Sequence, residues 1–171
     1  DERCVGPQED ASNFNLANRT FLHKIPIPGD NVHRVHGEYD DYTKAVRYYE
    51  DSIRDVFALK GREVPRFDLI VLGMGADGHI GSLFRNSYAL FDTEDLVSVV
   101  YFPNGGYDRI TLTHPVLRAA SHLLILVSGE KKADILKEVL ESEPDEVKYP
   151  VHALWPILDK ITWIVDNEAA G

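Results

Sequence analysis

Residues 68–84 combine glycines with an aspartate and a histidine at a spacing that suits acid–base chemistry. Gly73 and Gly75 follow a run of apolar residues, and Asp77 stands two residues before His79. Glycines let a backbone approach a ligand closely, and their N–H groups can bind an anion or an oxyanion. A carboxylate can orient an imidazole, and an imidazole with an ordinary pKa of about 6.5 exchanges protons near neutrality. We therefore interpret Asp77 and His79 as a candidate acid–base pair.

The same stretch permits two other interpretations. Residues 73–78 match the glycine pattern of dinucleotide-binding turns, but that motif requires an acidic residue at the end of the next strand. Here the next apolar run ends in Tyr101 and Phe102, and the nearest acidic residues precede it. The third interpretation gives neither side chain a catalytic role: His79 caps a helix and Asp77 forms an Asx turn. The other histidines show no metal-ligand spacing, so we predict no metal site.

Four short runs rich in apolar and β-branched residues predict strands, and a weaker fifth follows a proline–glycine segment. Three of the four are continuously apolar, which is typical of parallel strands that are covered on both faces. The four runs are residues 67–72, 97–102, 122–127 and 161–165, and the weaker one is residues 32–35.

Helical periodicity occurs between these runs. Apolar residues repeat with a 3.6-residue period within 42–57 and again within 133–140. Ser12 is a good N-cap for a helix that continues to Ile25. Residues 82–86 could begin a helix directly behind the glycine turn, and its N-terminus would strengthen an anion site there. Strands that alternate with helices predict an α/β fold with a mainly parallel sheet, in which ligands bind at the carboxyl ends of strands.

The composition excludes several classes of protein. The 18 Lys and Arg residues against 28 Asp and Glu give a net charge of −10, which disfavours a nucleic-acid partner. The single cysteine, Cys4, excludes an internal disulfide framework. No apolar run approaches the roughly 20 residues of a membrane span, and residues 1–3 are charged rather than typical of a signal peptide. We therefore expect a soluble, cytoplasmic protein with neither nucleic acid nor membrane as partner.

Six segments occur in an order that spans essentially the whole chain: Asp1–Arg3, Ser12–Asn13, Leu72–Phe84, Arg109–Thr113, Gly129–Ala133 and Trp163–Asp166. Together they resemble the 6-phosphogluconolactonase family, and the central Gly-x-Gly-x-Asp-Gly-His-x-x-Ser-Leu-Phe is the most specific of them. Such enzymes hydrolyse 6-phospho-D-glucono-1,5-lactone to 6-phosphogluconate, the second step of the oxidative pentose phosphate pathway. The resemblance implies that no metal or organic cofactor is needed.

The resemblance also implies an architecture. It is that of the sugar-phosphate isomerases, a Rossmann-related three-layer sandwich in which an open, mainly parallel sheet has helices on both faces. Residues 1–171 would form a single α/β domain, the C-terminal two-thirds of a longer family domain that includes a phosphate-holding loop rich in Gly and Ser. We expect a monomer or a weak homodimer that binds a small phosphosugar lactone.

Carried over residue by residue, the resemblance implies that His79 is the general base that activates water and that Asp77 supports its imidazole. Arg3 and Lys132 would grip the 6-phosphate. The substrate-binding positions that it implies are Asp1, Arg3, Gly73, Gly75, Arg109 and Lys132. The sequence departs from the family at Arg85, where the family usually has proline.

Two further functions stay open. Glucosamine-6-phosphate deaminase is a relative with a similar Asp-Gly-His-Ile turn, but it carries a glutamate five residues after the histidine, where this chain has Phe84. The other possibility is a non-catalytic protein that binds sugar phosphates. By the resemblance, we expect the phosphate-holding loop to be absent, which would favour a binding protein, whereas the Asp77–His79 pair favours an enzyme.

Overall fold

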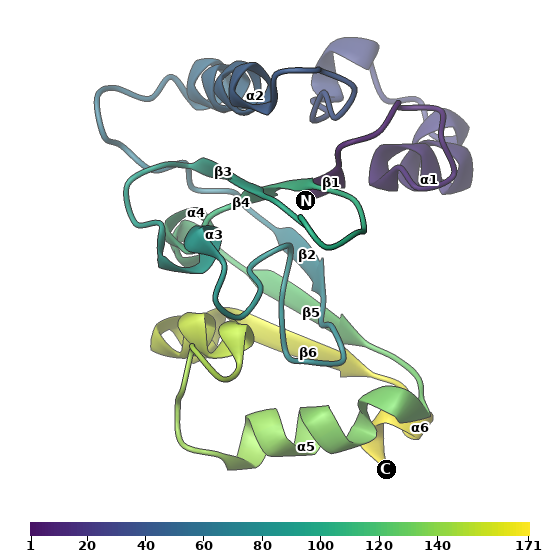
Figure 1. Cartoon of the computed structure of the whole chain (residues 1–171), viewed down its shortest axis with the longest axis vertical. Coiled ribbons are helices and arrows are strands. Elements are labelled where there is room, and N and C mark those ends of the chain that lie inside the picture. The colour runs from purple at the N-terminus through teal and green to yellow at the C-terminus, as the bar shows by residue number, and fades with distance from the viewer.

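The computed structural model describes all 171 residues, which form two small sheets and the helices that pack on them (Figure 1). The strands are β1 (Glu2–Arg3), β2 (Ile70–Gly73), β3 (Val97–Val100), β4 (Arg109–Leu112), β5 (Leu123–Val127) and β6 (Ile161–Val165). The α-helices are α1 (Asn13–Thr20), α2 (Tyr42–Phe57), α3 (Tyr88–Phe91), α4 (His114–Ala119), α5 (Ala133–Glu141) and α6 (Asn167–Ala170). Four 3₁₀ segments are η1 (Leu22–Lys24), η2 (Gly29–Asn31), η3 (Glu130–Lys132) and η4 (Pro150–Lys160).

The strands divide between a parallel sheet and an antiparallel one. The parallel sheet has the order β2-β5-β6, with Ile70 beside Leu123 and Val127 beside Val165. The antiparallel sheet has the order β1-β4-β3. The expectation of one mainly parallel sheet therefore holds only for β2, β5 and β6, because residues 97–100 form an antiparallel strand instead. β3 returns to β4 through a short loop, and only antiparallel strands can be joined so closely, because a parallel neighbour needs a long crossover.

Helices cover one face of the parallel sheet. Leu123, Ile125 and Val127 point into the main core, where they meet buried residues of α4, α5, α6 and η4. On the opposite face, Val71, Leu126 and Ile164 are 43–55% exposed. The expected helices on both faces are therefore not present in this chain, and the alternation along β2, β5 and β6 is that of a half-covered sheet.

A second core joins the antiparallel sheet to α2. Ala45 and Ile53 of that helix pack against Val97 and Ile110, which lie on β3 and β4. In Figure 1 the helices α1 and α2 lie at one end of the molecule, and α5 and α6 lie at the other, with both sheets between them. No helix has both the length and the apolar character that crossing a membrane requires.

The predicted helices at 42–57 and 133–140 are confirmed as α2 and α5. Ser12 caps α1 by accepting a hydrogen bond from the N–H of Asn15, but that helix ends at Thr20 rather than continuing to Ile25. The weak run at 32–35 forms no strand.

No helix follows the glycine turn directly. Gly81 has φ +54° and Asn86 has φ +60°, and these left-handed conformations interrupt the segment before α3 begins at Tyr88. A helix N-terminus therefore does not contribute to the site, and any anion must be held by side chains and by the turn itself.

Candidate active site

The site is built on the turn that follows β2. Gly73 ends the strand, and the chain then folds back so that the N–H of Gly75 donates to the carbonyl of His79 at 2.8 Å. The N–H of Gly78 donates to the carbonyl of Gly75 at 3.1 Å, and Gly78 has φ +83°. The turn thus reverses the chain within a few residues and presents its side chains at the carboxyl end of the parallel strand β2.

Asp77 and His79 contact one another directly. Nδ1 of His79 lies 2.5 Å from Oδ1 of Asp77, and the backbone N–H of His79 donates to the same oxygen at 3.3 Å. Partial burial raises the pKa of Asp77, but the hydrogen bond and the charge of His79 outweigh it and hold that pKa below its usual value. A charged carboxylate at Nδ1 retains the proton there, which leaves Nε2 as the basic nitrogen.

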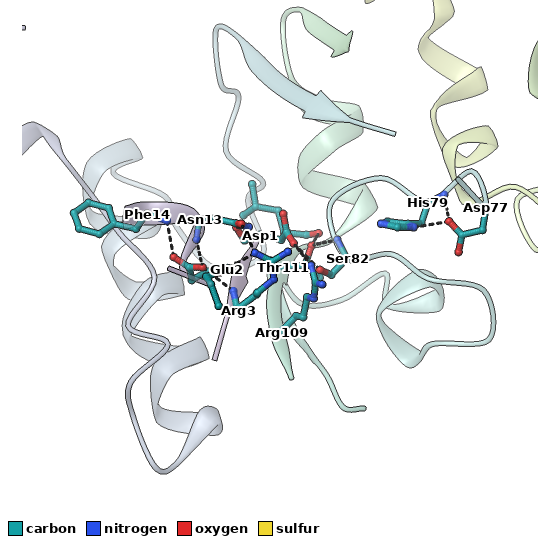
Figure 2. A network of polar contacts seen from close by, with 12 residues as sticks. Asp1, Glu2, Arg3, Asn13, Phe14, Asp77, His79, Ser82, Arg109 and Thr111 are labelled. Atoms are coloured by element: carbon teal, nitrogen blue, oxygen red, sulfur yellow. Dashed lines mark hydrogen bonds and ion pairs between the residues drawn. The ribbon is translucent and has the colours of Figure 1, made fainter. Parts of the chain in front are cut away.

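The ring of His79 extends away from Asp77 toward the side on which Asp1, Ser82 and Arg109 lie (Figure 2). No protein group forms a hydrogen bond with its Nε2. The ring packs against Phe84, with centroids 4.2 Å apart, and Phe84 in turn packs edge-on against Phe102. The histidine is thus held by a carboxylate at one nitrogen and by an aromatic face, while its other nitrogen is available to a ligand.

A second cluster of polar side chains connects Arg109 on β4 with Asp1, the first residue of the chain. Oδ2 of Asp1 accepts a hydrogen bond from Oγ of Ser82 at 2.7 Å and lies 3.4 Å from Nη1 of Arg109 (Figure 2). Nε of Arg109 is buried and has no hydrogen-bond partner. Burial, together with the nearby charge of Arg3, lowers the pKa of Arg109. This guanidinium is therefore poorly solvated and only partly paired, and a bound anion would stabilise it.

Lys132 borders the same region from another element. It lies in η3, which follows β5, and its ammonium group donates a hydrogen bond to the carbonyl of Met74. The resulting cleft has a volume of about 300 Å³. It is lined by Asp1, Asn13, Val71, Leu72, Gly73, Met74, Gly75, His79, Gly81, Arg109 and Lys132. Two cations and one imidazole thus face one polar cleft, in a chain that is otherwise strongly acidic.

Comparison with known proteins identifies the family. Residues 1–163 match the family model described as glucosamine-6-phosphate isomerases/6-phosphogluconolactonase. The 6-phosphogluconolactonase of Aggregatibacter actinomycetemcomitans is 34% identical over 170 residues, which cover 99% of this chain and 70% of that protein. The chain belongs to the 6-phosphogluconolactonase family. The human 6-phosphogluconolactonase is also 34% identical, across 99% of this chain and 65% of its own length.

Solved structures of the 6-phosphogluconolactonase family have the same fold. The 6-phosphogluconolactonase from Trypanosoma cruzi superposes with a TM-score of 0.83 at 30% identity, covering 99% of this chain and 69% of that one. The α/β architecture, with one parallel sheet and one small antiparallel sheet, is therefore that of the family.

Six of the eight residues predicted for a 6-phosphogluconolactonase site line the cleft, and the other two do not. Asp77 lies behind His79 and contacts its Nδ1. Arg3 turns toward α1, where its Nη1 donates to the carbonyl of Ala11 at 2.7 Å and to Oδ1 of Asn13 at 3.3 Å. A contact between Arg3 and a phosphate stays a prediction, and Arg109 is the arginine that borders the cleft in this structure.

Sequence reasoning missed three residues that shape the candidate site. Ser82 holds Asp1, Phe84 packs on His79, and Glu2 accepts hydrogen bonds from the N–H groups of Asn13 and Phe14 and from Oγ of Ser12. Ser82 and Phe84 lie in the specific motif, so their position was a usable signal. Glu2 lies in the Asp1–Arg3 segment of the resemblance, but its contacts with Ser12, Asn13 and Phe14 join residues ten or more positions apart, which the sequence does not show.

Proposed function

We propose that this chain hydrolyses 6-phospho-D-glucono-1,5-lactone and that His79 is the general base. The observation that carries the proposal is the arrangement of the imidazole, with Nδ1 on Asp77 and Nε2 unbonded at a cleft that Arg109 and Lys132 also line. Ester hydrolysis at neutral pH needs a base for water and an anchor for the substrate, and this site offers both. The family membership supports the same reaction.

In the proposed step, Nε2 of His79 accepts a proton from a water molecule as its oxygen attacks the lactone carbonyl. The imidazolium that forms is stabilised by the Asp77 carboxylate. Collapse of the tetrahedral intermediate breaks the bond between the carbonyl carbon and the ring oxygen, and the imidazolium returns its proton to that oxygen. The products are the open-chain carboxylic acid and a regenerated neutral histidine.

The two cations serve the other end of the substrate. Arg109 has a buried, unpartnered Nε, and Lys132 has an ammonium group bonded to only one carbonyl. A phosphate group can accept charge-assisted hydrogen bonds from both. Because the phosphate is remote from the reacting carbonyl, these contacts would position the substrate in the ground state and the transition state alike.

The aromatic contact at His79 favours lactone hydrolysis over deamination. The deaminases of this superfamily carry a glutamate five residues after the histidine, and here that position is Phe84, whose ring packs on the imidazole. No carboxylate other than that of Asp77 forms a hydrogen bond with His79. The glutamate that is typical of the deaminases is therefore replaced at this position by an apolar ring.

The test is a direct assay of the purified chain. We expect acid release from 6-phosphogluconolactone and no ammonia release from glucosamine 6-phosphate. His79→Ala should lower kcat about a hundredfold or more while binding of 6-phosphogluconate persists. An active His79→Ala variant would remove the histidine from the mechanism. Binding of 6-phosphogluconate without any turnover by the unaltered chain would instead favour the sugar-phosphate-binding alternative.

A further inference from the structure

The turn that carries Asp77 and His79 is fixed by groups outside the cleft, and the mechanism above does not use them. Asp77 O accepts a hydrogen bond from Nη2 of Arg85 at 2.9 Å. The next carbonyl along the chain, Gly78 O, accepts one from the N–H of Val151 at 3.0 Å. Two consecutive carbonyls of the turn thus accept hydrogen bonds from residues outside it, in addition to the two backbone hydrogen bonds within it.

Arg85 is itself held by a buried aromatic ring. Its guanidinium carbon lies 5.5 Å from the centroid of Tyr149, a residue that is only 1% exposed. The hydroxyl of Tyr149 donates to Glu138 on α5, and its backbone N–H donates to Asp145 O at 2.8 Å. The Lys148 ammonium also lies on this ring, 4.8 Å from its centroid. The ring is therefore a fixed surface on which the exposed arginine can stack.

The same ring touches the turn directly. A Cβ added to Gly78 would lie 3.3 Å from Cδ1 of Tyr149, so the glycine already packs closely on the aromatic side chain. Arg85 and Tyr149 therefore meet the turn at two adjacent residues, Asp77 and Gly78. Neither Arg85 nor Tyr149 lines the cleft.

We propose that Arg85, stacked on Tyr149, is a positioning residue that holds the backbone of Asp77 so that its carboxylate stays aligned with Nδ1 of His79. The inference rests on the proposed function, because it assigns a supporting group to that reaction. Asp77 needs such support, since its side chain is 45% exposed and has no hydrogen-bond partner other than His79. A small change in the orientation of a catalytic group can cost as much as a hundredfold in rate.

The kinetic test uses Arg85→Met, which removes the guanidinium and keeps an unbranched side chain. We expect kcat to fall about tenfold with KM within twofold of the original value, because Arg109 and Lys132 lie on other elements and remain in place. Arg85→Lys keeps a positive charge that can stack and donate one hydrogen bond, so it should recover part of the loss. The matched control is Arg62→Met, which removes the same charge from a highly exposed ion pair with Glu94.

A second measurement does not depend on turnover. Long-range ¹H–¹⁵N correlation spectra of the imidazole rings report which nitrogen of a histidine carries the proton, and His79→Gln identifies the signals of His79. Above neutral pH we expect the original chain to show His79 protonated at Nδ1, and Arg85→Met to shift its signals toward a mixture of both tautomers. The tautomer of His79 can be measured even if the chain proves inactive on the lactone. Failure of the proposed function and failure of the positioning role are therefore distinguishable.

Three results would overturn the positioning role. The first is an Arg85→Met variant in which both the protonated nitrogen of His79 and the kcat are the same as in the original chain. Another is an equal loss of kcat in Arg62→Met, which would make the effect one of net charge. The third is a raised KM with unaltered kcat in Arg85→Met, which would make Arg85 a substrate contact.

Discussion

A methyl group on Gly75 would lie 2.1 Å from Cε1 and 2.2 Å from Nδ1 of His79, well inside van der Waals contact. The imidazole therefore occupies the space that any other side chain at position 75 would fill. The Asp77 carboxylate is also close, since its Oδ1 would be 2.9 Å from the same methyl group. The aspartate–histidine pair thus depends on a glycine two residues before it.

Gly75→Ala should displace the imidazole rather than unfold the protein, because a partly exposed ring can swing away from the added methyl group. We expect kcat to fall at least tenfold, since the Asp77 contact would be lost. Gly29→Ala is the control, because a Cβ there would meet nothing within 4 Å. Circular dichroism would confirm that both variants fold. Equal lactonase activity in the two variants would show that the ring position is not needed.

Asp77→Asn should impair the reaction without altering the shape of the site. An amide at position 77 cannot stabilise an imidazolium, and its NH₂ group would favour the tautomer with the proton on Nε2. We expect kcat to fall about a hundredfold or more, with little change in KM. Asp68→Asn, at an exposed position at the start of the same segment, removes the same charge and should leave kcat unchanged. Retained activity in Asp77→Asn would contradict the assigned role of the carboxylate.

Lys132→Ala should weaken substrate binding. A charge-assisted hydrogen bond to a phosphate contributes about 1.5–3 kcal/mol, so we expect KM to rise roughly 10- to 100-fold with kcat little changed. The neighbouring Lys131 is exposed and does not line the cleft, so Lys131→Ala controls for charge. Steady-state kinetics on the lactone measures both. A fall in kcat with unaltered KM in Lys132→Ala would show that this lysine acts on the reacting carbonyl instead.

The Arg34–Glu38 ion pair should make stability depend on pH in the acid range. The guanidinium of Arg34 bonds both oxygens of Glu38, at 2.9 and 2.7 Å, and lowers the pKa of Glu38 to about 2. Because folding lowers the pKa of this carboxyl, the ion pair contributes its full stability above about pH 4.5. That contribution is lost as the pH falls toward 2.

Glu38→Gln should therefore cost about 1 kcal/mol of unfolding free energy at pH 7, given that the Glu38 side chain is 31% exposed. The difference should shrink as the pH is lowered through this range. Urea unfolding at a series of pH values measures it. Glu94→Gln, from the highly exposed Arg62–Glu94 pair, should change stability by much less. A cost for Glu38→Gln that stays constant with pH would contradict the ion-pair explanation.

Most of the local structure followed from the sequence. The apolar stripe of α2, the run that becomes β5 and the Ser12 cap depend on residues a few positions apart, which interact whatever the rest of the chain does. The contact between Asp77 and His79 is also local in sequence, because two residues of one tight turn cannot move far from one another. Resemblance to the family added the reaction that we propose and the prediction that Lys132 and Arg109 bind the substrate.

Only the tertiary structure decided which distant groups meet. A β-branched run predicts a strand but not its partner, so residues 97–100 paired with β4 rather than joining the parallel sheet. Arg109 meets Asp1, 108 positions earlier, and Arg85 reaches a tyrosine that lies on a different segment. Arg3 carries the charge expected of a phosphate ligand, yet it turns to α1, where nearby carbonyl and amide oxygens accept its hydrogen bonds. Such contacts depend on how the whole chain packs, and local composition carries no record of that packing.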